Sequence, residues 1–217
     1  GLEAIRQKLD LREDQKVSTS DLVNMAEFAL SNNIFVFSDI YKQQITGTAM
    51  GSKFAPPYAC IFMDVLETNF LAKEVFKPWC WKRYIDDIFF VWTHGREKLE
   101  EFLDRLNNAN PSIKFTHEAS EHHVNFLDIT VSLKGNRFST DLYTKPTDCH
   151  QYLHHDSCHP DHIKRSTVYS QGLRLRKICS EQQKFEDNIK TLEGWFLNRG
   201  YPHSLIKKEL KKVKETS

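Results

Sequence analysis

Two adjacent aspartates, Asp86 and Asp87, are the residues of this sequence that point most directly to chemistry. They lie between residues 79–84 and 88–92, two aromatic and β-branched segments that predict strands joined at the aspartates. Adjacent carboxylates repel each other, and a divalent cation such as Mg²⁺ or Mn²⁺ offsets that repulsion. Carboxylates on a rigid turn can hold the ions of a two-metal phosphoryl transfer. Aspartate is also common in plain hairpin turns, and the pair alone leaves that alternative open.

A loop upstream of the aspartates has the residues of a ligand-binding segment. It carries Gly47 and Gly51, and Pro56 follows at the predicted start of a long helix. Glycine lets the backbone approach a ligand closely, and a helix N-terminus favours phosphate. An ordinary helix-initiating loop is the alternative. Downstream, residues 125–131 predict one strand with a single charged position, Asp128, which by itself indicates a surface aspartate.

The elements that must position these residues follow from hydrophobic periodicity. Helices are predicted at residues 2–10, from a Ser20 cap to residues 32–33, from Pro56 onward, and at 97–108, 166–180, 182–198 and 203–214. Strands are predicted as a hairpin of residues 34–37 and 41–45 around Ser38-Asp39, and at 113–117, 124–133 and 137–144. Five aromatic residues are expected to fill the core beside the aspartates: Trp79, Trp81, Phe89, Phe90 and Trp92. Tyr84 fits either that core or a contact with a ligand.

Composition indicates an ordinary globular chain with a basic C-terminal end. Of 217 residues, 40% are hydrophobic and 27% charged, with a net charge of +1. Residues 1–140 carry 16 Lys and Arg against 19 Asp and Glu, a net of −3, and residues 141–217 carry 14 against 10, a net of +4. The five cysteines have no disulfide spacing, which favours a reducing, intracellular compartment. No apolar run predicts a membrane span, and no signal peptide or other targeting segment is expected; the sequence reads as a piece that begins inside a larger protein.

The C-terminal region predicts contact with a polyanion. Five basic residues are candidates for binding a nucleic-acid backbone: Lys145, Lys164, Arg165, Arg174 and Arg176. Three helices joined by short turns resemble a polymerase thumb and also a helix-turn-helix module, and a solvated basic helix face is the alternative. The lysines of residues 207–214 are expected at a fraying helix end. Residues 145–162 are dense in Cys and His but lack zinc-finger spacing, so zinc is not expected.

Six sequence blocks together resemble the reverse transcriptases of Penelope-like retroelements. They occur in the family's order and span nearly the whole chain, at residues 47–59 (GTAMGSKFAPPYA), 82–92 (KRYIDDIFFVW), 125–131 (NFLDITV), 142–154 (LYTKPTDCHQYLH), 169–180 (YSQGLRLRKICS) and 199–202 (RGYP). The resemblance implies an α+β fold: a right-hand polymerase palm with partial fingers in residues 1–144, followed by a helical, thumb-like or helix-turn-helix-like segment in residues 145–217. It also implies RNA-directed DNA synthesis.

The same resemblance assigns roles to individual residues. Asp86 and Asp87 are implied to be catalytic and to bind Mg²⁺ or Mn²⁺, Asp86 the more closely. A template and nucleotide pocket is implied for Gly47, Ala49, Met50, Gly51, Pro56 and Tyr84. A primer grip is implied for Phe126, Leu127 and Asp128. The implied partners are an RNA template, a DNA primer and dNTPs, and the parent element is expected in the nucleus.

One departure from the family limits this expectation. Reverse transcriptases carry a further catalytic aspartate on an earlier palm strand, and Gly1 to Ile5 resembles sequence just after that strand. A two-metal site that lacks a carboxylate binds metal poorly, so this chain alone is expected to lack polymerase activity. Two other interpretations stay open. One is a non-enzymatic nucleic-acid-binding module built on the C-terminal helices, and the other is an inactive retroelement remnant.

Overall fold

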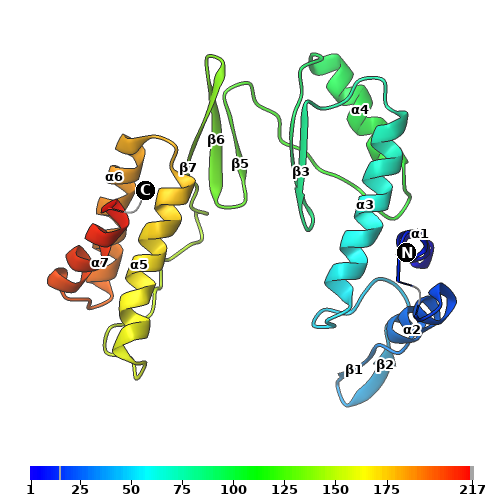
Figure 1. Ribbon diagram of the computed structural model, residues 1–217, viewed down its shortest axis with the longest axis horizontal. Helices are drawn as coiled ribbons and strands as arrows, with labels where there is room; N and C mark the ends of the chain where they lie inside the picture. Colours follow the sequence, from blue (N-terminus) through cyan, green and yellow to red (C-terminus); the bar gives the residue numbers. More distant parts are fainter. Residues whose placement is uncertain (15, 216–217) are drawn as a thin grey trace. The chain divides into compact units, whose positions relative to one another are not determined.

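The computed structural model describes residues 1–14 and 16–215, which form helices and small antiparallel sheets, a mixed α+β fold (Figure 1). The chain divides into two compact units, Gly1–Thr116 and His117–Ser217. Each unit has its own buried core. The boundary predicted after residue 144 separates two functional regions, a palm and a thumb-like segment, and it stays a prediction.

The first unit begins with two helices that pack on each other. Helix α1 spans Leu2–Asp10 and helix α2 spans Thr19–Ser31. The cap of α2 is Ser18, whose hydroxyl accepts a hydrogen bond from the backbone N–H of Asp21 at 3.1 Å. The predicted cap, Ser20, was therefore wrong by two positions, because Ser18 is the last residue with extended backbone before the helix.

The predicted hairpin that follows is confirmed. Strands β1 (Ile34–Phe37) and β2 (Ile40–Gln43) pair antiparallel. Ser38 and Asp39 form the two-residue turn, and both adopt left-handed backbone, as hairpin turns of this length prefer. Every residue of the two strands is exposed, including large apolar side chains such as Phe37.

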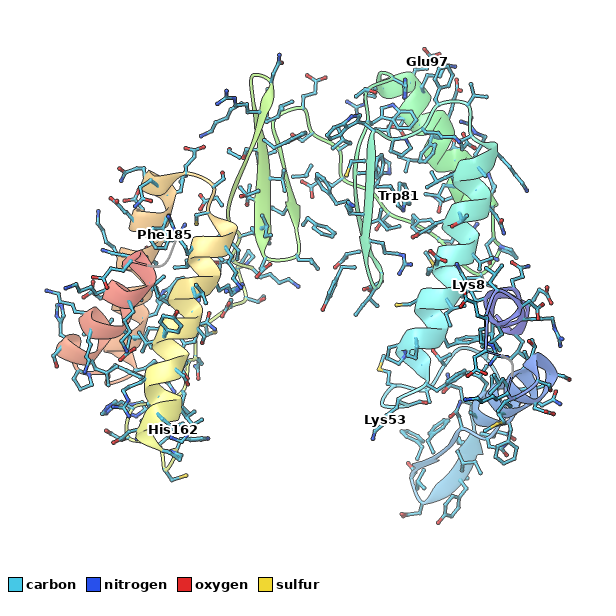
Figure 2. All side chains as sticks on the ribbon, in the orientation of Figure 1. Lys8, Lys53, Trp81, Glu97, His162 and Phe185 are labelled. Carbon is cyan, nitrogen blue, oxygen red and sulfur yellow. The ribbon has the colours of Figure 1, made fainter. Side chains whose placement is uncertain are left out.

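The rest of the first unit packs a long helix and a shorter one against a second hairpin. The bounds are Ala55–Lys73 for α3, Cys80–Tyr84 for β3, Asp87–Val91 for β4 and Arg96–Asn108 for α4. Trp81 lies on β3 (Figure 2) and stacks on Phe90 of β4, and both pack against the buried Phe102 of α4. The aromatic core expected here is confirmed for Trp81, Phe90 and Trp92. It was wrong for Trp79, which is 73% exposed just before β3.

The strand predicted at residues 113–117 does not form. The side chain of Asn107 instead binds the backbone groups of Phe115 in the middle of this segment. It accepts from the N–H of Phe115 at 2.6 Å and donates to the carbonyl of the same residue at 3.1 Å. A side-chain amide therefore satisfies the groups that a neighbouring strand would otherwise bind.

The second unit begins with a three-stranded meander. Strands β5 (His123–Phe126), β6 (Ile129–Lys134) and β7 (Arg137–Leu142) pair antiparallel in that order. The single strand predicted over residues 124–133 was wrong. A two-residue turn at Leu127-Asp128 folds that segment back on itself, with Leu127 in left-handed backbone.

Three helices complete the second unit. They are α5 (Asp161–Ile178), α6 (Gln182–Asn198) and α7 (His203–Glu215). Their shared core includes Phe185, which α6 contributes (Figure 2), and the apolar face of α7. Gly172 lets α5 and α7 approach closely, since a Cβ atom there would lie 2.8 Å from Cδ2 of Leu210 and 3.0 Å from Cγ2 of Val213. The predicted turn at Gly200-Tyr201-Pro202 separates α6 from α7.

Candidate nucleic-acid interface and acidic hairpin turn

The two aspartates lie at the end of the β3–β4 hairpin. Tyr84 and Asp87 are paired across the strands, so the turn consists of Ile85 and Asp86. All four side chains are exposed. Ile85 has φ of 55°, a left-handed conformation that is strained for a β-branched residue. This arrangement leaves both carboxylates accessible on a turn of fixed register.

A buried ion pair, which the sequence analysis missed, fixes this turn to α3. Arg83 donates from Nε to Oε1 of Glu67 at 2.6 Å, and the two side chains are only 13% and 10% exposed. The same guanidinium donates to the carbonyl of Ile85 at 3.1 Å and to the carbonyl of Cys60 at 3.4 Å. Burial raises the pKa of the Glu67 carboxyl, and Arg83 opposes that rise. The sequence did hold a signal for this ion pair, namely an arginine within a predicted apolar strand and a glutamate within a predicted apolar helix.

Asp86 and Asp87 alone supply too few ligands for a complete metal centre. Carboxylate oxygens are the donors that Mg²⁺ prefers. Among the described residues, however, no three or more His, Cys, Asp or Glu side chains gather so that they could hold an ion. The carboxylate oxygens of the pair are suitable ligands for Mg²⁺. The remaining oxygen ligands would have to come from water or a phosphate substrate.

The Cys- and His-rich segment between β7 and α5 lies against α6. His150 stacks on Trp195 with ring centroids 3.5 Å apart, and Tyr152 stacks on Phe196 at 4.8 Å. Arg199 donates from Nε to the carbonyl of Tyr152 at 2.7 Å. These contacts show a structural role for His150 and Tyr152, in which they cover one end of α6.

The glycine loop forms one wall of an open pocket in the first unit. Gly47 and Gly51 have φ of 76° and 88°, which side-chain-bearing residues rarely adopt. Ala49 and Met50 line the pocket, whose volume is about 340 Å³, together with residues that follow α2, belong to β1 or follow β2: Asn32, Asn33, Ile34, Phe35 and Gln44. Pro56 lies in the first turn of α3, as predicted. Of the six residues predicted to form a template and nucleotide pocket, only Ala49 and Met50 line this one, and Gly47, Gly51, Pro56 and Tyr84 do not.

The candidate primer-grip residues form the β5–β6 turn, and one of them is engaged. Leu127 has φ of 56°, so an apolar residue with left-handed backbone precedes an aspartate here as at Ile85-Asp86. The Asp128 carboxylate accepts hydrogen bonds from Nε of Arg174 at 2.9 Å and from its Nη2. The structure therefore pairs two residues to which the sequence analysis gave separate roles.

The other basic candidates of the second unit differ in how free they are. Lys164 is buried and lies 4.0 Å from a carboxylate oxygen of Asp161. Arg176 donates to Oε1 of Gln182 at 3.0 Å and lies over the ring of Phe185. Lys145 and Arg165 are exposed. Of the four candidates on α5, Lys164, Arg174 and Arg176 therefore have partners within the unit, and Arg165 remains exposed.

Helix α7 is not a fraying helix end, contrary to the prediction. Ile206 and Val213 are 0% exposed and Leu210 is nearly so, which fixes the helix along most of its length. The apolar residues occur at i, i+4 and i+7 and form the buried face, so the lysines between them are held on an ordered surface.

Comparison with protein families gives one match in this unit. Residues 151–211 match the animal helix-turn-helix domain family, which covers α5, α6 and most of α7. The match indicates a nucleic-acid-binding segment. Comparison with curated proteins and with solved structures gives no match. Among residues 1–14 and 16–215, none of the helices has the length and hydropathy needed to cross a membrane.

Proposed function

We propose that this chain binds nucleic acid through the helices of its second unit. The family match of residues 151–211 carries the proposal. Charge supports it, because residues 141–217 hold 14 Lys and Arg against 10 Asp and Glu. Contacts of Lys and Arg with phosphates supply most of the sequence-independent affinity of nucleic-acid-binding proteins.

The proposed mode is contact with the sugar-phosphate backbone, as in a polymerase thumb. Base edges are read chiefly by Arg, Asn and Gln, which form paired hydrogen bonds with them. The sequence of α7, the last helix of the unit, contains none of these three residue types and five lysines. Lysine contacts phosphate as a point charge and carries no sequence information.

Fluorescence anisotropy tests this proposal with the full chain. Three labelled duplexes of unrelated sequence, an RNA–DNA hybrid and a single strand are titrated at about 50 mM salt. Similar affinities for the three duplexes are expected. Absence of binding to every nucleic acid would overturn the proposal, and strong preference for one duplex sequence would overturn the backbone mode.

RNA-directed DNA polymerase activity of the parent protein is the second candidate function. The observation that favours it is the acidic turn of β3–β4, at the position where the resemblance to Penelope-like reverse transcriptases implies the catalytic carboxylates. In that function Asp86 and Asp87 bind Mg²⁺, which when bound activates the primer 3′-hydroxyl and stabilises the leaving pyrophosphate. Arg83 then holds the turn through the carbonyl of Ile85.

The remaining roles in this candidate function belong to the two loops already described. The segment from Gly47 to Pro56 borders the template and the incoming dNTP, and the positive φ angles of Gly47 and Gly51 support that role because glycine lets the backbone approach a ligand closely. The β5–β6 turn positions the DNA primer on its RNA template. The donor set lacks one carboxylate among the described residues, so the chain alone is proposed to be inactive.

Paramagnetic broadening by Mn²⁺ tests the metal-binding role without requiring activity. Amide NMR signals near Asp86 and Asp87 are expected to broaden at millimolar Mn²⁺, and the double variant Asp86→Asn/Asp87→Asn should lose this effect. Equal broadening in the double variant would refute the role. A primer-extension assay accompanies it, and metal-dependent synthesis by the chain alone would contradict the proposed inactivity.

A further inference from the structure

Helix α7 presents lysines on an ordered face beside its buried face. Ile206, Leu210 and Val213 share the buried face, and each is followed by a lysine. The three lysines therefore form a second line at i, i+4 and i+7, about 100° around the helix from the first. They are Lys207, Lys211 and Lys214. The line extends about 10 Å along the axis, and all three side chains are exposed.

The charge of this lysine face is largely uncompensated. Within residues 16–215, Lys207 and Lys214 make no ion pair. Lys211 lies 3.8 Å from a carboxylate oxygen of Glu215, and both side chains are mostly exposed. Such a surface pair is weak and leaves the lysine available. The other glutamate of α7, Glu209, is buried and paired with Lys212 at 2.5 Å, away from this line.

Several other basic residues of the unit are engaged, whereas Lys145, Arg165 and Lys177 are exposed and make no ion pair among the described residues. Arg174 is bound to Asp128, and Lys164 is buried. Three exposed lysines on other elements each have a carboxylate partner at 3.5 Å or less: Lys134 with Glu181, Lys184 with Asp141 and Lys190 with Asp187. The face of α7 therefore places three lysines, none with a carboxylate oxygen of the described residues within 3.5 Å, on one line of a helix, whereas Arg165 and Lys177 lie twelve positions apart on α5.

We infer that the line Lys207–Lys211–Lys214 on α7 is the surface that holds the nucleic-acid backbone, in place of the basic face of α5. The inference rests on the proposed nucleic-acid binding and names the contact surface. Phosphates are the partner, because three ammonium groups with no aromatic or apolar residue between them can contact charge and little else. An anionic membrane fits less well, since the apolar residues of α7 are already buried in the core and cannot enter lipid.

Two triple variants of the full chain test this surface. The first is Lys207→Gln/Lys211→Gln/Lys214→Gln. The second, a matched control, is Lys134→Gln/Lys184→Gln/Lys190→Gln, which removes the same charge from other elements of the unit. Glutamine keeps the helices, and circular dichroism checks the fold. Affinity for a labelled RNA–DNA hybrid is measured by anisotropy between about 50 and 200 mM KCl.

The lysine face is expected to account for much of the salt dependence. Loss of three phosphate contacts reduces the magnitude of the negative slope of log K against log[KCl], where K is the association constant, by about 3. Affinity at low salt falls at least tenfold. The control variant should keep the wild-type slope within about 1. Equal losses in both variants, or no loss in the first, would overturn the inference while wild-type binding still supported the proposed function.

Failure of the proposed function gives a different result, namely that the wild-type chain does not bind the hybrid. Polyglutamate and anionic vesicles serve as competitors. Displacement of the hybrid by nucleic acid alone, at equal charge concentration, supports phosphate backbone as the partner. Displacement by polyglutamate or vesicles as effective as that by nucleic acid would overturn this choice of partner.

Discussion

Replacement of Arg83 by methionine should destabilise the first unit in a way that depends on pH. The guanidinium lies 2.6 Å from Glu67 and donates to the carbonyl of Ile85. Methionine has a similar length and no donor, so Glu67 is left buried without its cation. Removal of one partner of a buried ion pair typically costs about 3–5 kcal/mol. We expect a loss of that size near neutral pH.

The pH dependence follows from the direction of the Glu67 pKa. Burial raises the pKa, and Arg83 opposes the rise in the wild type. A carboxyl whose pKa is raised by folding contributes full stability below its unfolded pKa, and that contribution is lost as pH increases through its folded pKa. Without Arg83 the pKa rises further. The loss in Arg83→Met should therefore be larger at pH 8 than at pH 5, where Glu67 can take up a proton.

Urea unfolding at the two pH values measures this effect. A Trp195→Phe background is used for every variant, because the remaining tryptophans, at positions 79, 81 and 92, all lie in the first unit. The second variant, Arg83→Met/Glu67→Gln, removes the buried charge altogether. It should recover only part of the loss at pH 8, because the about 1.5–3 kcal/mol of a charged hydrogen bond to the turn is not restored.

Two results together would contradict the proposed role of the Arg83–Glu67 pair. The first is a loss in Arg83→Met that is equal at pH 5 and pH 8. The second is a double variant that is no more stable than Arg83→Met alone. Both would mean that Glu67 carries no buried charge that depends on Arg83, and that the guanidinium acts only through packing.

Three further predictions concern the second unit. Gly172→Leu should destabilise the unit by about 1–3 kcal/mol, measured by urea unfolding followed at its single tryptophan, since the new side chain collides with α7; an unchanged midpoint would contradict that packing. Cys149 and Cys158 are exposed, whereas burial raises the pKa of the buried Cys179, so Ellman's reagent should modify Cys179 last, and its modification first would be contrary to the structure. Burial alone would raise the pKa of Asp141, but hydrogen bonds from neighbouring side chains outweigh it and lower the pKa. The stability that Asp141 contributes is present above its unfolded pKa and lost as pH falls through its folded pKa, so Asp141→Asn should flatten the stability of the unit below about pH 4, and an unaltered acid profile would argue against this.

Regular patterns in the sequence were sufficient for several elements around the acidic turn. Helix α4 has apolar residues at helical spacing and was predicted within one residue of its observed bounds. Strands β3 and β4 are rich in aromatic and β-branched residues, so their existence and their antiparallel pairing were also predictable. The exact turn was displaced by one residue, since Asp87 belongs to β4 and Ile85 occupies the turn.

The turn between β5 and β6 gave no usable signal. Leu127 adopts left-handed backbone within a run of apolar residues, and its neighbour Asp128 is the only polar hint of a turn there. Sequence patterns therefore favoured one long strand. The hairpin forms because β6 pairs with strands on both sides, a tertiary effect that no local pattern encodes.

Contacts between distant positions were equally inaccessible to the sequence analysis. Arg174 appeared to be a free phosphate ligand, but its partner Asp128 lies 46 positions earlier. The pairing of Arg83 with Glu67 depends on how α3 packs against β3. The lysines of α7 were underestimated for a similar reason, because only the packing of α5 on α7 shows that the helix is fixed.

The most direct test of the central claim is ultraviolet cross-linking of the full chain to an RNA–DNA hybrid, with the cross-linked peptides identified by mass spectrometry. Cross-links are expected in residues 145–215, including peptides of α7. Cross-links confined to residues 1–116, or a chain that forms none although the hybrid is in excess, would contradict the proposal that the second unit binds nucleic acid.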